Sequence, residues 1–285
     1  MTVMIVAHRV EPTNKLLVEE WARRGIDARI VAPAAARRAL RSSDVVVCRL
    51  DVLPTLDGIE PGLEAVGELA ALGVRVVNPP DALVGAHDKL ETARRLVAHA
   101  IAHPAVVHVA QPDDPVELAF PVVVKPRHGS WGQDVYRCTT PRELRRCLGR
   151  VRARPWFERH GALVQELVEP SARDLRLIVA GARVVGGAAR VAAPGEWRSN
   201  VSLGGHIVGT PLDADARSLA VAACDALGIG LGGVDIIRGE DGRCTVIEVN
   251  GAADFDERYA LPHTSIFDEV AGALGLLPAL QRDAC

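Results

Sequence analysis

The 285-residue sequence has no apolar run approaching the ~20 residues that a membrane-spanning helix needs. It also lacks the basic start and long apolar stretch of a secretory signal, because residues 3–7 form only a short apolar run. Basic residues are not in excess either: the formal net charge is −3, so no overall positive field attracts nucleic acid or anionic lipid. These absences predict a soluble protein with no membrane or nucleic-acid partner.

Several sequence motifs of known chemistry are absent as well. The six cysteines are scattered without a CxxC pair, which argues against a zinc site or a disulfide framework and favours a reducing cytoplasm. No GxGxxG follows the first predicted strand and no GK[ST] follows a glycine-bearing loop, so neither NAD binding nor a Walker-type loop is indicated. HExxH and GxSxG are missing, which argues against zinc and serine hydrolases.

The length exceeds what one hydrophobic core usually serves, so we expect more than one lobe. In residues 1–85, strand-like apolar runs alternate with helical patterns, which predicts a parallel sheet with crossover connections. Residues 86–165 are expected to form a small α+β lobe, and residues 166–285 a lobe that begins with a hairpin. The predicted fold class is therefore α/β and α+β, in three lobes.

Periodicity and turn residues also predict the individual elements. Helices are expected at 16–22, 63–72, 90–102, 141–151, 213–227 and 266–274. Strands are expected at 3–7, 28–31, 44–48, 74–77, 120–125, 136–138, 163–167, 174–180, 184–191, 233–237 and 244–249. The last two strands are joined by a turn at 239–242 and are expected to pair antiparallel.

A cluster of polar side chains occurs in these last two strands. Glu248 and Asn250 project from one face of their strand because side chains alternate, and antiparallel pairing can bring Asp235 close to them. Two carboxylates and an amide oxygen are hard ligands that suit Mg²⁺. The alternative is a hairpin with a solvated acidic face, but carboxylates between Val and Ile in buried strands would be costly without a counter-ion. We therefore predict a metal site.

A lysine and a glycine-bearing loop follow the strand at 120–125. Lys125 stands at the strand end, where it can contact a phosphate as a point charge, and the glycines of Gly129-Ser130-Trp131-Gly132 let backbone N–H groups approach phosphate oxygens. Without the metal cluster, a plain hairpin loop would be the better interpretation. His128 in the same loop can also contact a phosphate, but we expect it to be exposed.

Arginines in the last lobe form a third candidate group. Arg176 and Arg190 fall in the two strands of the predicted hairpin, and Arg198 follows the loop after it. Guanidinium groups bind carboxylates and phosphates, and they stabilise charge that develops during acyl transfer. The alternative is ordinary surface arginine, which is frequent in this chain. In the first lobe, Arg49 and Asp51 lie at a strand end from which they can reach a substrate.

Taken in order, these residues resemble the ATP-grasp superfamily, and within it the RimK-like branch of ribosomal protein S6 glutamate ligases and LysX-type amino-acid ligases. The resemblance covers about residues 40–275, and although no single motif is decisive, the ordered set is highly specific. The matching segments are Asp88-Lys89-Leu90, Val-Val-Val-Lys-Pro-Arg-His-Gly-Ser-Trp-Gly at 122–132, Val-Gln-Glu-Leu-Val at 164–168, Asp-Leu-Arg at 174–176, Ala-Ala-Arg at 188–190, Glu-Trp-Arg-Ser-Asn at 196–200, Gly204-Gly205, Gly-Val-Asp-Ile at 233–236 and Glu-Val-Asn at 248–250.

The resemblance implies a binding site for ATP. Lys89 and Lys125 would contact its phosphates, and Glu166 with Leu167 would lie at the hinge where backbone atoms read the adenine. Asp174 would hold the ribose. A mobile lid over the triphosphate would consist of Gly129, Ser130, Trp131 and Gly132.

The resemblance also implies a reaction centre with two Mg²⁺ ions, which Mn²⁺ can replace. Arg198, Ser199 and Asn200 would lie at the phosphates and the reacting atoms, and Arg190 would face an acyl phosphate. The metal ligands would be Asp235, Glu248 and Asn250.

A three-lobed ATP-grasp fold with a Rossmann-like first lobe is the implied architecture. The implied reaction joins a carboxylate to an amine, with an amino acid as one substrate, and releases ADP and phosphate. The amine can be free or carried on a protein, and the family suggests a homo-oligomer. Two alternatives stay open: an ATP-dependent cyclisation of a small amino-acid derivative, and a nucleotide-binding regulator without turnover. The complete metal set and Arg190 argue against the regulator.

Two positions depart from the family pattern. Asp134 stands where the glycine-bearing loop usually has another glycine, which puts the lid geometry in doubt. After Glu-Val-Asn the family usually has a short Ser-Pro-Gly-type loop that helps to hold substrate, and here residues 251–255 read Gly-Ala-Ala-Asp-Phe. We expect the nucleotide chemistry to survive this second change, whereas the identity of the substrate is not implied.

Overall fold

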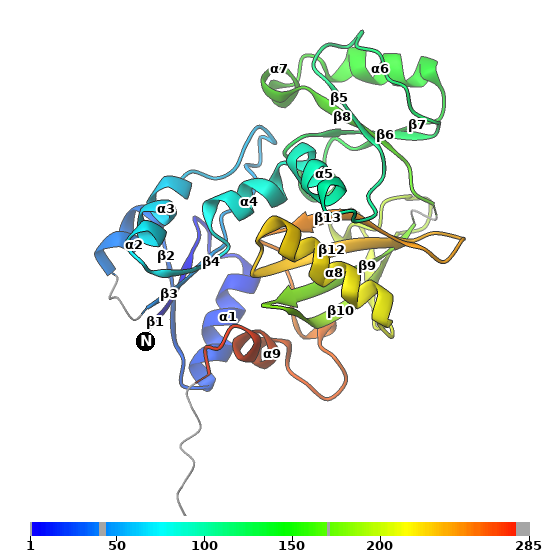
Figure 1. Ribbon diagram of the computed structural model, residues 1–285. Helices are drawn as coiled ribbons and strands as arrows, with labels where there is room; N and C mark the ends of the chain where they lie inside the picture. The colour runs from blue at the N-terminus through cyan, green and yellow to red at the C-terminus, as the bar shows by residue number, and fades with distance from the viewer. Residues whose placement is uncertain (1, 40–43, 170–171, 278–285) are drawn as a thin grey trace, which may run out of the picture.

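The computed structural model describes residues 2–39, 44–169 and 172–277, and its strands form three separate sheets (Figure 1). The first sheet is parallel and the other two are antiparallel. The predicted α/β and α+β fold class is therefore confirmed. None of the helices within the described ranges has both the length and the apolar character to cross a membrane. The division at residues 85 and 165 stays a proposal.

The first sheet has the strand order β2-β1-β3-β4, with helices on both faces. The apolar run in β1 is completely buried, as expected for a parallel strand that is covered on both sides. The strands are β1 (Thr2–Val6), β2 (Asp27–Val31), β3 (Val45–Cys48) and β4 (Arg75–Val77). The helices are α1 (Pro12–Arg23), α2 (Pro33–Ala39) and α3 (Leu63–Ala71).

The second sheet has the order β5-β8-β6-β7 and lies apart from the first, at the upper right of Figure 1. Helix α6 begins with a Thr140 side chain that accepts a hydrogen bond from the N–H of Glu143, which satisfies one of the free donors of its first turn. Its elements are β5 (Val106–Val109), β6 (Val122–Pro126), β7 (Tyr136–Cys138), α6 (Pro141–Val151), α7 (Pro155–His160) and β8 (Ala162–Glu166). Two helices connect it to the first sheet: α4 (Pro80–His87) and α5 (Lys89–Ala98).

The third sheet has the order β11-β10-β9-β12-β13. Helix α8 packs against it, with Asp213 as its N-terminal cap and Gly228 in a left-handed conformation at its end, as the sequence predicts. The strands are β9 (Arg173–Ala180), β10 (Arg183–Val191), β11 (His206–Val208), β12 (Leu231–Arg238) and β13 (Cys244–Asn250). The helical segments are η1 (Val201–Leu203), α8 (Ala214–Leu227), η2 (Glu257–Tyr259) and α9 (Ile266–Ala273).

The hydrophobic cores divide unequally among the sheets. Two core clusters contain residues from both the first and the third sheet, with Val46 and Val234 in one and Ile5 and Ile178 in the other. The second sheet has a core of its own, apart from Leu56. The first and third sheets are therefore joined by shared packing, whereas the core of the second sheet is separate.

Among the described residues, one expected boundary is wrong, and five elements form where none was predicted, namely α2, α4, α7, β5 and β11. The helix predicted at 90–102 ends at Ala98, because Ala100 takes a left-handed conformation (φ 55°) and the N–H of Ile101 bonds back to the carbonyl of Leu96. Strand β5 is present where no strand is predicted. It has only four residues, and it is held by its pairing with β8, which is distant in sequence.

Asn78, directly after β4, connects the first lobe to β12 and β13. Its side chain is fully buried, and its backbone is left-handed (φ 61°), a conformation that Asn tolerates better than most residues. Its Nδ2 donates to the carbonyl oxygens of Leu231 (2.7 Å) and Gly251 (2.8 Å). Its Oδ1 accepts from the N–H groups of Gly230 (2.9 Å) and Leu231 (3.0 Å). One amide therefore fixes the start of β12 and the end of β13.

Asn78→Ala removes these bonds and leaves buried backbone groups without partners. We expect the free energy of unfolding to fall by about 2–4 kcal/mol, measured by urea denaturation. Gln111→Ala is the control, because it also removes an amide side chain but from an exposed position, and it should change stability by less than about 0.5 kcal/mol. Equal stability of the two variants would contradict this role of Asn78.

Candidate active site

A cavity of about 130 Å³ lies between the second sheet and strands β12 and β13. All of the predicted site residues except Asn250 line this cavity. They are Lys89, Lys125, Gly129, Ser130, Trp131, Gly132, Glu166, Leu167, Asp174, Arg190, Arg198, Ser199, Asn200, Asp235 and Glu248. Residues that are up to 159 positions apart are thus brought together, as the ordered motifs require.

The three predicted metal ligands lie on the adjacent strands β12 and β13. Asp235 is the cross-strand partner of Glu248, and Gly233 is the partner of Asn250. Val249 between them is fully buried, whereas Glu248 and Asn250 are partly exposed, so the predicted alternation is observed. Glu248 lines both this cavity and a second one, and Asn250 lines only the second. Asp235 lines only the first cavity, so Glu248 is the one residue of the three that the two cavities share.

Asp235 is bound by two arginines in the interior. Its Oδ2 accepts hydrogen bonds from Nη2 of Arg176 (2.8 Å) and Nη2 of Arg190 (2.7 Å), and its Oδ1 accepts from Nε of Arg176 (2.5 Å). Burial alone would raise the pKa of Asp235, but the two guanidinium groups hold it below its usual range. The sequence identified all three residues, but not this pairing.

Arg190 is held from its other side by Asp174. Nε of Arg190 donates to Oδ1 of Asp174 (2.8 Å), Nη2 donates to Oδ2, and the Ser199 hydroxyl also donates to Oδ2 (2.7 Å). The predicted contact of Asp174 with a ribose stays a prediction. In this structure, the carboxylate orients Arg190 and links it to Ser199.

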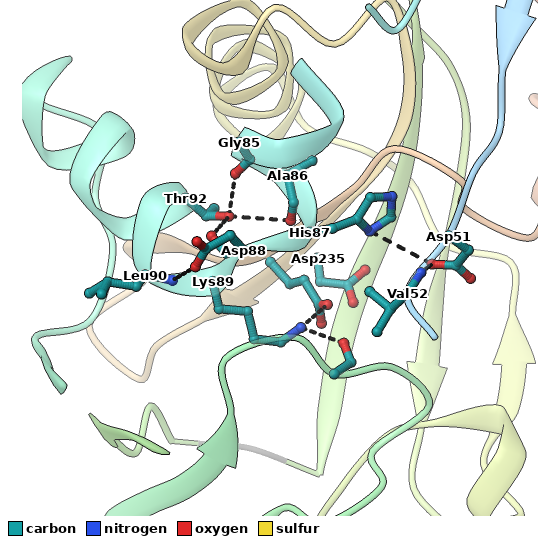
Figure 2. A network of polar contacts seen from close by, with 12 residues as sticks. Asp51, Val52, Gly85, Ala86, His87, Asp88, Lys89, Leu90, Thr92 and Asp235 are labelled. Atoms are coloured by element: carbon teal, nitrogen blue, oxygen red, sulfur yellow. Dashed lines mark hydrogen bonds and ion pairs between the residues drawn. The ribbon is translucent and has the colours of Figure 1, made fainter. Parts of the chain in front are cut away.

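Lys89 reaches the site from the start of α5 (Figure 2). Its Nζ donates to Oε1 of Glu248 (2.8 Å) and to the carbonyl of Gly129. Asp88 caps the helix by accepting from the N–H of Leu90 (3.1 Å), and it forms an ion pair with Arg127 (2.5 Å). Asp88 and Arg127 therefore position Lys89 against the loop. Asp88 belongs to the matched motif, but nothing in the sequence indicates its partner.

The glycine-bearing loop is bound to the third lobe. Nη1 of Arg198 donates to the carbonyl of Gly132 (2.9 Å), and the Ser202 hydroxyl donates to the carbonyl of Trp131 (2.9 Å). Gly132 has φ 71°, a left-handed conformation that favours glycine, and a Cβ atom there would lie 2.8 Å from Oδ1 of Asn200. The loop therefore covers the cavity in this structure.

The backbone at Asp134 shows how this residue replaces the glycine that the family usually has in the loop. Asp134 has φ 51°, so it adopts the left-handed conformation that glycine favours, and Asp tolerates it. Its carboxylate accepts from the indole N–H of Trp156 (2.8 Å) and the hydroxyl of Tyr136 (2.8 Å). The substitution thus keeps the turn and adds two hydrogen bonds to the second lobe.

The expected exposure of His128 is wrong. Its side chain is buried, with its ring centroid 4.7 Å from that of His160. Burial lowers the pKa of His128 to about 4, so the imidazole is neutral at physiological pH. The glycines beside it in the sequence gave no sign that α7, which carries His160, would cover it.

The predicted adenine hinge follows β8. The N–H of Leu167 bonds to the carbonyl of Pro121 (3.1 Å), and the N–H of Glu166 bonds to the carbonyl of Ala105 (3.0 Å). These two donors are engaged within the protein, so they are not free to bind a base. Adenine recognition by this segment stays a prediction and would involve its other backbone groups.

The predicted Mg²⁺ site stays a prediction, although its donor types are ones that Mg²⁺ accepts beside a nucleotide. Among the described residues, no group of three His, Cys, Asp or Glu side chains is arranged to hold a metal ion. The candidate set has two carboxylates and one amide, and the carboxylates are paired with Lys89 and arginines. Mg²⁺ in such sites takes one or two carboxylates and completes its shell with water and phosphate oxygens. We therefore expect weak metal binding without ATP.

Comparisons with known proteins fit these observations. Residues 86–265 match the model of the RimK-like ATP-grasp domain. The chain belongs to this family. It is thus an ATP-grasp ligase, and enzymes of this family use ATP with Mg²⁺.

Named relatives cover most of the chain. It is 32% identical over 257 residues to a probable alpha-L-glutamate ligase of Xanthomonas oryzae pv. oryzae. The match covers 84% of this chain and 84% of that protein. It is 31% identical over 222 residues to beta-citrylglutamate synthase B of Danio rerio, and the match covers 74% of this chain but only 53% of that protein.

Solved structures of ATP-grasp proteins share the fold. A RimK domain ATP-grasp protein of Sphaerobacter thermophilus has a TM-score of 0.66 at 21% identity, covering 97% of this chain and 99% of the other. D-cycloserine synthetase DcsG has a TM-score of 0.68 at 21% identity, covering 96% and 99%. The expected ATP-grasp architecture is therefore confirmed.

Asp235→Ala should destabilise the unliganded fold. It leaves two buried guanidinium groups without their shared partner, so we expect the free energy of unfolding to fall by about 3–5 kcal/mol in denaturant titrations. Asn250→Ala, on the paired strand, removes no ion pair and should cost about 1 kcal/mol or less. If Asp235→Ala is as stable as the wild type, the pairing of Asp235 with the two arginines contributes little to the free energy of unfolding.

Lys125 should make nucleotide binding depend on pH. Burial, with the nearby charge of Lys89, lowers its pKa from 10.5 to about 8. In the unfolded chain the lysine keeps its ordinary pKa of 10.5, so between about pH 8 and 10.5 it holds a proton that the folded protein has lost. Lys125 therefore makes the free energy of unfolding rise with pH in this range. In the folded protein, the ammonium charge of Lys125 that attracts phosphates is present below about pH 8. Titration calorimetry with Mg²⁺ and a non-hydrolysable ATP analogue should therefore show weaker binding as the pH rises above about 8.

Lys125→Met is the matching variant. It should bind the analogue more weakly at neutral pH and lose the decrease above about pH 8. The same decrease in Lys125→Met and wild type would show that another group titrates.

Proposed function

We propose that the enzyme joins a substrate carboxylate to an amine through an acyl phosphate and releases ADP and phosphate. The observation that carries this proposal is the convergence of Lys89, Lys125, Asp235 and Glu248 on one cavity under the glycine-bearing loop. That cavity shares part of its lining with a second cavity, which can hold the other reactants. No nucleophilic side chain is needed, because the substrate itself attacks ATP.

The lysines and the loop act on the triphosphate. Lys125 and Lys89 supply positive charge to the phosphate oxygens, and the segment 129–132 excludes water that would hydrolyse the activated acid. We propose that Asp235, Glu248 and Asn250 hold two Mg²⁺ ions, with Mn²⁺ able to replace them. When bound, these ions neutralise charge on the terminal phosphates.

The arginines act on the acyl group. The substrate carboxylate attacks the γ-phosphorus, ADP leaves, and the amine then attacks the acyl carbon with loss of phosphate. Arg190 stabilises the negative charge on the oxygen of this centre, because Asp174 and Asp235 fix its guanidinium in place before reaction. Arg198 closes the loop and, with Ser199 and Asn200, approaches the phosphates. Glu166 and Leu167 contact the adenine, and Asp174 contacts the ribose.

The relatives support an amino acid as one substrate. The Xanthomonas protein is named as a glutamate ligase, and the Danio protein as a synthase of a glutamate conjugate. We propose glutamate or another small amino acid for this chain, with a free or protein-borne amine. A cytoplasmic homo-oligomer completes the proposal. Five cysteines are free in the described ranges, which fits a reducing compartment; Cys285 lies outside them.

A phosphate-release assay over paired acids and amines, followed by mass spectrometry, tests the reaction. We expect ADP and phosphate only when an acid and an amine are both present. Glu248→Gln should reduce the rate by about 100-fold or more, because it removes charge stabilisation in the transition state while keeping the shape of the side chain. Formation of AMP and pyrophosphate would refute the acyl-phosphate route. Phosphate release with a single compound would favour cyclisation instead.

A further inference from the structure

A narrow loop of residues 52–59 leaves the first lobe between β3 and α3 and extends toward α7 of the second lobe (Figure 1). At its base, Val52 and Ile59 pair antiparallel, and the N–H of Leu53 bonds to the carbonyl of Gly58 (2.9 Å). The 52–59 loop therefore has a hydrogen-bonded base and presents its tip to the neighbouring lobe.

Leu56, at the tip of this loop, packs in the core of the second lobe. It is 5% exposed, and every other described residue of that core lies at 107–164. Its backbone is left-handed (φ 61°), a conformation that is costly for a leucine and persists only where the surroundings fix it. Burial of the Leu56 side chain in the second lobe therefore offsets the strain of its backbone.

Asp57, the next residue, makes polar contacts with α7. Nε2 of His160 donates to the carbonyl of Asp57 (2.8 Å), and Nη1 of Arg159 lies 3.3 Å from its carboxylate Oδ2. The Thr55 hydroxyl donates to Oδ1 of the same carboxylate (2.5 Å) and holds it in this orientation. The tip of the 52–59 loop is therefore bound to the second lobe by apolar packing, a hydrogen bond and an ion pair.

Helix α7 in turn contacts both ends of the glycine-bearing loop. The ring of His160 lies against that of His128, directly before Gly129, with 4.7 Å between the centroids. At the other end, the indole N–H of Trp156 donates to the carboxylate of Asp134 (2.8 Å). The first lobe is therefore connected, through α7, to the segment that covers the cavity.

The position of the second lobe sets the width of this cavity, because the cavity lies between the second sheet and strands β12 and β13. The first and third sheets share two cores, whereas the core of the second sheet is separate. The orientation of the second lobe thus depends on contacts between lobes. The 52–59 loop makes such contacts from the side of the jointly packed pair.

We propose that the 52–59 loop holds the second lobe over the cavity, with Leu56 and Asp57 as positioning residues for nucleotide binding. Neither residue lines either of the two cavities, so both act through α7 and the glycine-bearing loop rather than on a substrate. When Leu56 leaves the core of the second lobe, that lobe is free to move away and the cavity opens. This inference rests on the proposed function, because it takes the cavity as the ATP site.

Small-angle X-ray scattering of the full chain without ligand tests whether the loop holds the lobe. Leu56→Gly removes the side chain, and glycine suits the left-handed backbone at this position, so the loop can keep its shape. We expect a larger radius of gyration for Leu56→Gly than for the wild type. Urea denaturation of the same sample should still show a cooperative transition, because the other residues of the second core remain.

Titration calorimetry with Mg²⁺ and a non-hydrolysable ATP analogue tests the effect on the site. The apparent affinity falls with the fraction of molecules in which the lobe is in place, so Leu56→Gly should bind the analogue about ten-fold more weakly. Leu56→Met fills the same space and should stay within about two-fold of the wild type. Leu72→Ala is the control, because it removes a leucine side chain that is 70% exposed in the same lobe, and it should change neither measurement.

A charge exchange at the ion pair gives a second test that does not alter a core. Arg159 is an exposed residue, so Arg159→Glu should fold normally and place a carboxylate beside Asp57. We expect this variant to bind the analogue about two- to five-fold more weakly, the effect of one exposed ion pair. The double variant Asp57→Lys with Arg159→Glu should recover most of the lost affinity, which a role confined to the folding of α7 would not produce.

The wild-type radius of gyration in folded Leu56→Gly would overturn the proposal, even with weaker analogue binding, since Leu56 would then act only within the second core. Unchanged analogue affinity in that variant would also overturn it. If Leu56→Gly does not fold, the charge exchange decides, and a double variant no better than Arg159→Glu would sink the proposal.

The two proposals fail separately. If Leu56→Gly expands the molecule and weakens the analogue, but no acid and amine release phosphate in the wild type, the ligase reaction is wrong and the role of the 52–59 loop stands. If phosphate is released and Leu56→Gly keeps the wild-type radius and KM for ATP, the ligase stands and the role of the loop is wrong.

Discussion

The buried carboxylate of Asp235, shared between Arg176 and Arg190, is the interaction on which the site depends. A carboxylate that is 4% exposed is costly unless it is paired and hydrogen-bonded, and here two guanidinium groups from neighbouring strands satisfy it. The same pairing fixes Arg190, whose other side is held by Asp174. The guanidinium that we propose for catalysis, that of Arg190, is therefore held in place by the same ion pairs that stabilise the fold.

This network lies on a frame made by two lobes. Strands β12 and β13 belong to the third sheet, but their ends are fixed by Asn78 from the first lobe, and the first and third sheets share two cores. The second lobe has its own core and reaches the site through Lys125 and the glycine-bearing loop. The two lobes with shared cores thus carry the metal candidates and Arg190, and the separately packed lobe carries Lys125 and the loop that are predicted to contact phosphates.

Local patterns predicted much of this arrangement. The helix after Asp213 ends before Gly228 because both caps are visible in the sequence, and alternation placed Glu248 and Asn250 on one face of β13. What the sequence did not indicate depends on contacts between distant elements. The pairing of Arg176 with Asp235 spans 59 positions, and the burial of His128 depends on α7. Motif order identifies which residues matter, whereas only the folded chain shows how they are paired.

The balance of charge differs between the two cavities for a physical reason. In the cavity under the glycine-bearing loop, Lys89 and the arginines match the carboxylates of Glu248, Asp235 and Asp174, so these buried charges are compensated without a ligand. In the second cavity, burial raises the pKa of Asp51 to about 6, so this carboxylate is less stable as an anion than one in water.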